Sequence, residues 1–171
     1  MTTRAKNAQE LDRSAAILTP VPHELLVAGR RLCKERGHVA FMTKSAQPLA
    51  KAERLRDGRE LAVLIFASKD PGSTRGDYRV TWLGRFRGFT PCGTPAAVSA
   101  RLNRPESDVA DMPGACLWFL SNLVQLDPEL TKPLSSILTF GNGEARSGLP
   151  PHGLCVVPYP SWLLQLEPLL R

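Results

Sequence analysis

Cysteine is scarce in this sequence and is not arranged for cross-linking or metal binding. Cys33, Cys92, Cys116 and Cys155 are widely spaced, and no C-x-x-C pair occurs. Such spacing argues against a disulfide framework and against a zinc knuckle. His152 and Cys155 have the spacing of two metal ligands, but no second pair accompanies them. We therefore expect reduced, mostly buried thiols, no metal site and no cofactor.

Long hydrophobic runs are also missing. The longest, Leu61–Ala67, is far shorter than the roughly 18 to 20 residues that span a bilayer. The opening residues, MTTRAKNAQELDRS, lack the apolar stretch of a secretion signal. We therefore expect a cytoplasmic protein with no membrane partner.

The sequence contains none of the catalytic motifs that we can recognise. No serine lies in a G-x-S-x-G elbow, and no pair of acids falls at an obvious strand end. Glu24, Asp57 and Asp77 lie beside basic residues, where ordinary surface ion pairing explains them. Enzymatic activity stays open, but we name no catalytic residue and favour a non-catalytic role.

Length, composition and charge point to one domain with an anionic partner. The 171 residues, 43% of them hydrophobic, suffice for a single core. We expect residues 1–18 to form a loose N-terminal arm and residues 19–171 to form the domain. The net charge of +6 favours polyanions, because each neutralised phosphate releases a counterion.

Charge is also segregated along the chain. Six arginines and one acid lie between Arg75 and Arg104, whereas five acids and no base lie between Pro105 and Leu130. This asymmetry suits a polarised surface, although solvated faces on either side of a loop produce the same pattern.

Hydrophobic periodicity predicts an α+β fold. Helical spacing and turn residues indicate helices or helical turns at Pro22–Arg36, Pro48–Arg56, Thr131–Leu138 and Ser161–Leu170. Strand-like runs occur at His38–Thr43, Glu60–Ser68, Asp77–Arg87, Ala115–Leu126 and Leu154–Pro158. This order favours a small, mixed-strand, partly closed β-barrel with flanking short helices over an alternating βαβ sheet.

The centre of the predicted fold is a hairpin. Glu60–Ser68 is apolar on both faces, which indicates a central strand, and the segment KDPGSTRG that follows is rich in turn residues. We expect this strand to pair antiparallel with Asp77–Arg87. In the second strand, alternation places aromatic residues such as Trp82 on one face and arginines such as Arg85 on the other.

Three stretches resemble EVE domains of the PUA-like superfamily. HVAFMTKSAQP is similar to the EVE start, where an aromatic strand enters a Lys-Ser-x-Pro turn. LRDGRELAVLIFASKDPGSTRGDYRVTWLGRF is similar to the central strands, and GLCVVPYPSWLLQLEPLL to the closing strand and helix. The likeness covers most of Val39–Leu170. The glycine-arginine-asparagine segment that helps line the EVE pocket is absent, since Leu55–Glu60 crosses that gap directly.

The resemblance implies a non-catalytic module that binds DNA or RNA and takes a base, modified bases included, into an aromatic-lined pocket. We assign the base-binding pocket to Lys44, Ser45, Trp82 and Trp118. The alternative is that the tryptophans are core residues and that Lys44 and Ser45 form a solvated turn. Full burial of both tryptophans would count against the binding module as a whole and would favour a protein-interaction domain.

Arg79, Arg85 and Arg87 are the predicted phosphate contacts, because a guanidinium group matches phosphate oxygens bidentately. Protection of an edge strand by charge would leave the same pattern. Two other function classes remain open: a protein-interaction or inhibitor domain that uses the Glu106–Asp111 loop or the basic strand, and a nucleic-acid-modifying enzyme.

Overall fold

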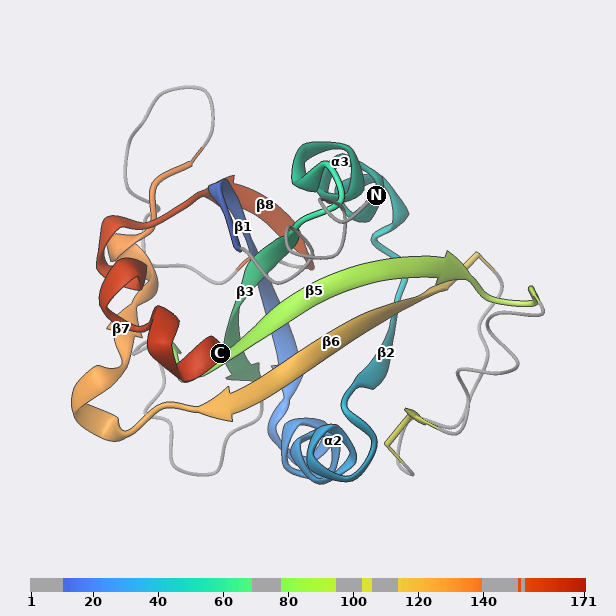
Figure 1. Cartoon of the computed structure of the whole chain (residues 1–171), viewed down its shortest axis with the longest axis horizontal. Coiled ribbons are helices and arrows are strands. Elements are labelled where there is room, and N and C mark those ends of the chain that lie inside the picture. Colours follow the sequence, from blue (N-terminus) through green and yellow to red (C-terminus); the bar gives the residue numbers. More distant parts are fainter. Residues whose placement is uncertain (1–10, 69–77, 95–102, 106–113, 140–150, 152) are drawn as a thin grey trace, which may run out of the picture.

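The computed structural model describes residues 11–68, 78–94, 103–105, 114–139, 151 and 153–171. Figure 1 shows how its elements are arranged. The strands are β1 (Leu11–Pro22), β2 (Val39–Thr43), β3 (Glu60–Ser68), β4 (Arg79–Val80), β5 (Trp82–Pro91), β6 (Cys116–Gln125), β7 (Lys132–Pro133) and β8 (Cys155–Pro158). The α-helices are α2 (His23–Arg36) and α3 (Ala46–Arg56), and the 3-10 helices are η2 (Pro128–Leu130), η3 (Leu134–Ser136), η4 (Ser161–Gln165) and η5 (Glu167–Leu170).

Six strands form one mixed sheet in the order β2-β6-β5-β3-β1-β8. Strands β1 and β3 are parallel, and every other neighbouring pair in this sheet is antiparallel. The end strands β2 and β8 do not pair with each other within the described residues, so the sheet is open (Figure 1). The α+β class and the mixed strands are confirmed, but no barrel closure is found.

The central hairpin forms as predicted, with one change. Strands β3 and β5 pair antiparallel, with Leu61 opposite Phe86 and Ile65 opposite Trp82; the connecting turn lies outside the described residues. The predicted second strand is interrupted at Thr81. Before this interruption, Arg79 and Val80 form β4, which leaves the main sheet and pairs with β7.

The start of the domain differs from the prediction. Residues 11–18, which we expected in a loose arm, form the first part of β1, while residues 1–10 lie outside the described chain. Ala15 through Leu18 are fully buried because β1 lies between β3 and β8. The prediction failed because β1 pairs with strands distant in sequence, and such pairing leaves little local signal.

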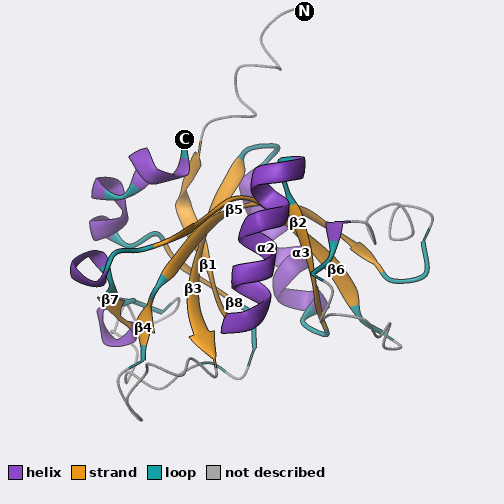
Figure 2. Ribbon diagram, turned by 90° about the horizontal axis from the view of Figure 1, so that it is seen from below, coloured by secondary structure: helices purple, strands orange, loops and turns teal. Residues whose placement is uncertain are grey.

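Both faces of the sheet are buried. Along β3, Leu61, Val63 and Ile65 belong to a first core, and the alternate residues Ala62 and Leu64 belong to a second. Helices α2 and α3 contact the sheet on the side of the first core (Figure 2). The second core packs against the C-terminal 3-10 helices. The prediction that Glu60–Ser68 is a central strand is therefore confirmed.

Neither α2 nor α3 is long and apolar enough to span a membrane, and the same holds for every helix in the described residues.

Helix α2 matches the predicted span, and it ends where Gly37 adopts a left-handed conformation at φ 82° and donates its N–H to Cys33 O at 2.9 Å. The predicted final helix instead divides into η4 and η5, with Pro168 in the first turn of the second. Proline lacks the N–H that a continuous helix would need there.

A buried carboxylate ties the C-terminal segment to the start of β1. Glu167 accepts two hydrogen bonds from the guanidinium of Arg13, each 2.7 Å long, and a third from the hydroxyl of Tyr159. The hydrogen bonds from Arg13 hold the pKa of Glu167 below its usual value despite burial. Burial and the same carboxylate raise the pKa of Tyr159.

We expect Glu167→Gln to lower the free energy of unfolding at pH 7 by about 1.5–3 kcal/mol, since a charge-assisted hydrogen-bonded pair is lost. The folded-state pKa of Glu167 is depressed, so its stabilisation is present above the unfolded pKa of about 4.3 and is lost as pH falls through the folded pKa. Urea unfolding of both proteins across this range measures the difference. Glu129→Gln, at an exposed acid, is the control. A difference that persists unchanged in acid would contradict this account.

Candidate binding cavity

A cavity of about 280 Å³ opens where four segments distant in sequence converge. Its walls come from the end of β1 and the start of α2, from the end of β2 and the turn that follows it, from β6, and from the residues just before β8. The lining consists of residues 19–22, Leu25, residues 41–45, Trp118 and residues 153–154. The cavity therefore contains the predicted residues Lys44, Ser45 and Trp118.

Local chain chemistry builds two of the walls. Strand β1 ends in Thr-Pro-Val-Pro, and Pro22 adopts an extended conformation at the start of α2. Proline fixes φ and removes an N–H, so Pro20 and Pro22 present rigid apolar rings at this point. On the opposite wall, β2 ends at Thr43, and Lys44 and Ser45 separate it from the start of α3 at Ala46.

The turn between β2 and α3 leaves polar groups available to the cavity. The side chain of Thr43 accepts a hydrogen bond from the N–H of Ser45 at 3.1 Å, which holds the turn. Ser45 occupies the N-cap position of α3, but its hydroxyl makes no capping hydrogen bond. A Cβ atom added to Gly153 would lie only 3.0 Å from Ser45 Oγ, so the hydroxyl lies close to the backbone of Gly153 at the edge of the cavity.

The same turn carries positive charge from a lysine and from a helix N-terminus. Lys44 is exposed, and no ion pair to it is found within the described residues. Helix α3 begins beside it with no acidic residue in its first turn. A helix N-terminus carries a partial positive charge, which adds to that of the lysine. The rim of the cavity therefore favours an anionic group.

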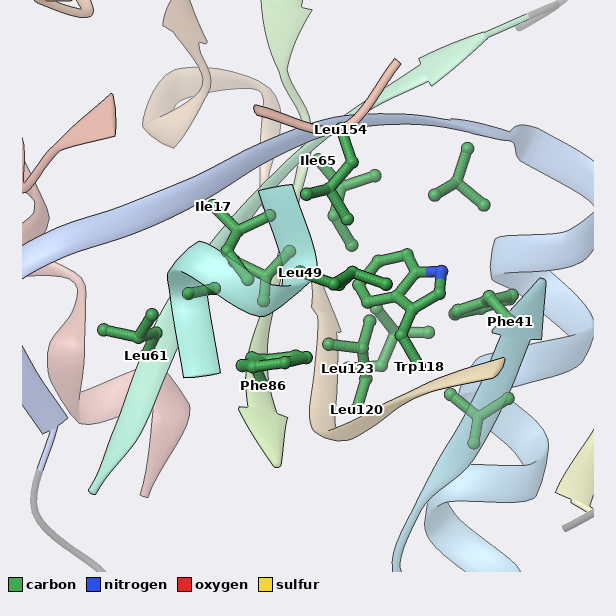
Figure 3. Packing of buried hydrophobic residues seen from close by; sticks show 14 of the residues in the cluster. Ile17, Phe41, Leu49, Leu61, Ile65, Phe86, Trp118, Leu120, Leu123 and Leu154 are labelled. Atoms are coloured by element: carbon green, nitrogen blue, oxygen red, sulfur yellow. The ribbon is translucent and has the colours of Figure 1, made fainter. Parts of the chain in front are cut away.

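Trp118 forms the inner wall but exposes little of its ring. The residue is 2% exposed, and its ring centroid lies 5.8 Å from that of Phe41 at a tilt of 44°. Figure 3 shows the indole between Phe41 on one side and Leu49 on the other, with its nitrogen on the side of Phe41. Trp118 thus belongs to the first core and, at this burial, offers the cavity no open stacking face.

Trp82 lies elsewhere. It is 1% exposed, belongs to the first core and does not line the cavity. Its ring meets the ring of His23 edge-on at 6.4 Å. The alternative that Trp82 is a core residue therefore holds, because β5 lies in the interior of the sheet and one of its faces is covered by the helices.

The three predicted phosphate contacts do not form a common groove. Arg79 donates to Thr131, at 2.8 Å to the hydroxyl and 2.9 Å to the carbonyl oxygen. Arg85 is 8% exposed, ion-paired with Glu60 and hydrogen-bonded to Leu170 O at 3.0 Å. Arg79 is half-buried, whereas the side chain of Arg87 is 52% exposed and lies 3.5 Å from Glu60.

Arg85 therefore requires a correction. The alternating pattern indicated a basic face, but that face is covered by the C-terminal 3-10 helices, which the sequence did not place there. A guanidinium group buried against a carboxylate satisfies that carboxylate and not an external phosphate.

Several lining residues were not among the predicted site residues. Pro20, Pro22 and Leu25 come from a strand end and a helix start that carried no ligand-binding pattern, and Gly153 lies in a loop. The Pro-x-Pro spacing beside a predicted helix start was the available signal. No group of three or more metal-ligating side chains occurs in the part of the chain that the structure describes, and the four cysteines are unpaired.

No model of a known protein family matches this chain, and no curated protein shows significant similarity to it. The likeness to EVE domains therefore remains a prediction that depends on the three stretches quoted above.

We expect Arg85→Met to destabilise the fold by about 3–5 kcal/mol, because Glu60 would stay buried without its main partner. Arg87→Met removes the more exposed partner of the same carboxylate and should change stability by about 0–1 kcal/mol. Urea denaturation of the two variants measures the contrast. Adding Glu60→Met to Arg85→Met should restore part of the loss. Equal effects of the two single changes would show that Arg85 is no more than a surface cation.

Proposed function

We propose that this chain is a non-catalytic nucleic-acid-binding module, built on a PUA-like scaffold, that takes one unstacked base into the cavity beside Lys44 and Ser45. One observation carries the proposal: three kinds of group border the same small cavity. They are apolar side chains, the hydroxyl of Ser45, which makes no capping hydrogen bond, and the N-terminus of α3 with Lys44 beside it. A base attached to its phosphate needs all three kinds of contact.

The size and walls of the cavity suit a single flat ring. Its volume of about 280 Å³ lies just below the roughly 300–1,000 Å³ usual for small-molecule sites. Pro20, Pro22 and Leu25 supply apolar surface, and the largely buried Trp118 also lines the cavity. An unstacked base would bury its faces against these groups.

Polar groups at the rim supply the remaining contacts. The hydroxyl of Ser45 can donate one hydrogen bond and accept others, which suits the mixed donors and acceptors on the edge of a base. Lys44 and the N-terminus of α3 favour the phosphate that the base carries with it. Hydrogen bonds and shape carry the recognition here, because neither tryptophan offers the open stacking platform that would be worth roughly 1–3 kcal/mol.

A protein-interaction domain is the second candidate, and two observations favour it. Both Trp82 and Trp118 are buried, and the predicted row of arginines does not form a groove. The strands β2 and β8 also end the sheet and could each accept a partner strand. The acidic loop named for this reading, Glu106–Asp111, lies outside the described residues.

Ligand entry should change the fluorescence of Trp118, because this is the tryptophan that lines the cavity. Titration with single-stranded DNA and RNA oligonucleotides, with and without modified bases, should shift the emission of the wild type. The shift should disappear in Trp118→Phe and persist in Trp82→Phe. If no oligonucleotide binds in a salt-sensitive way, the nucleic-acid proposal fails and the protein-interaction candidate replaces it.

Ser45→Ala should weaken oligonucleotide binding by about 0.5–1.5 kcal/mol, which corresponds to the loss of one hydrogen bond. Because the Ser45 hydroxyl makes no capping hydrogen bond, the change should have little effect on the stability of α3. Fluorescence anisotropy of a labelled oligonucleotide measures the affinity. Ser135→Ala, at an exposed serine outside the cavity, is the matched control. If these two variants bind the oligonucleotide with equal affinity, Ser45 does not contact the ligand.

A further inference from the structure

A second hollow lies along the outer side of α3. This groove has a volume of about 540 Å³ and is formed between α3 and the edge strand β8. Gln47, Lys51 and Arg54 line it from the helix, and Cys155 and Val156 line it from the strand. No function proposed so far uses it.

The groove continues from the cavity along both of its walls. On one wall, Lys44 and Ser45 line the cavity and Gln47 lines the groove. On the other wall, residues 153–154 line the cavity and residues 155–156 line the groove. The same two segments of chain therefore border both hollows, and a ligand that leaves the cavity at its rim meets the groove next.

A stripe of three cations and one neutral residue follows the helix wall. Gln47, Lys51 and Arg54 are separated by four and three residues, which places them along one side of α3, and Lys44 lies two residues before the helix begins. All four are exposed. At 1.5 Å per residue, the helical part of the stripe, from Gln47 to Arg54, is about 10 Å long.

No carboxylate interrupts this stripe within α3. The one acid of the helix is Glu53, which is bound to Arg56 through two hydrogen bonds. Glu53 Oε2 lies 3.7 Å from the position of a Cβ atom on Gly88, so the pair faces β5 and not the groove. The one acid of α3 is therefore directed away from the groove.

We infer that the groove binds the phosphate backbone of the strand whose base enters the cavity. The inference rests on the proposed function and specifies its ligand as a single-stranded oligonucleotide and not a free nucleoside. Lys51 and Arg54 lie about 4.5 Å apart along the axis of α3, so the groove wall can contact more than one phosphate of a strand. A positive groove that follows the backbone beside a base site is the usual arrangement in single-strand binding. A single strand also allows a base to enter the cavity without the cost of opening a duplex.

The test compares two double variants that remove the same charge from different helices. The double change Lys51→Ala with Arg54→Ala removes the two cations that line the groove. The double change Arg30→Ala with Lys34→Ala removes two exposed cations from α2. Affinity for a labelled single-stranded oligonucleotide of about twelve nucleotides, within the usual site sizes, is measured between 50 and 200 mM salt. The fluorescence of Trp118 at saturation reports whether the base still enters the cavity.

The groove variant should lose two phosphate contacts, which lowers the slope of log affinity against log salt by about 1.4. Over the fourfold range of salt, this equals about a sevenfold smaller loss of affinity than in the wild type. The Trp118 response at saturation should remain, and the α2 variant should match the wild type.

Other outcomes separate the two proposals. If the oligonucleotide binds with a Trp118 response but both double variants have the same slope, the groove inference fails and the base site stands. If no oligonucleotide binds, both fail. If the groove variant instead loses affinity for polyglutamate and the wild type binds no nucleic acid, the groove accepts an acidic protein segment, and the inference is overturned.

Discussion

The parallel pairing of β1 with β3 is the constraint on which the rest of the structure depends. It places β1 inside the sheet, where Ile17 lies opposite Val63, and leaves β8 to pair with its other side. With β1 in place, the sheet has two buried faces and needs a cover on each. Helices α2 and α3 cover one face, and the C-terminal 3-10 helices cover the other. The end of β1 at Pro22 also determines where α2 begins and therefore where one wall of the cavity lies.

Buried charges attach the C-terminal cover to the sheet. Arg85 joins Glu60 to the carbonyl oxygen of Leu170, and Asn122 donates to the same oxygen at 3.0 Å. Glu167 forms a separate cluster with Arg13 and Tyr159. Apolar packing alone has little directional preference, whereas these hydrogen bonds require one position of the C-terminal segment. The arginine pattern that suggested a binding surface thus belongs in part to the architecture.

The candidate site lies where chain ends meet, and not on the aromatic face of the sheet. The turn before α3 lines the cavity and α3 itself lines the groove, while on the other side residues 153–154 line the cavity and residues 155–156 line the groove. This arrangement explains why Lys44 and Ser45 lie at the junction of the two hollows. Recognition of the ring and contact with its backbone would then use neighbouring turns of a single rigid element.

Local pattern by itself determined α2, β2, α3, β3, β6 and β8, because hydrophobic periodicity and turn residues act over a few positions. The family resemblance, and not local pattern, named Lys44, Ser45, Trp82 and Trp118 as a pocket, and the structure places all of these but Trp82 around one cavity. Only the tertiary structure decided that residues 11–18 are a buried strand, that Trp82 is core and that Arg85 is internal. Each of these outcomes depends on which distant segment covers the residue, through the β1–β3 pairing or the return of the C-terminal segment. Alternation along a strand separates its two faces but does not reveal what packs against either of them.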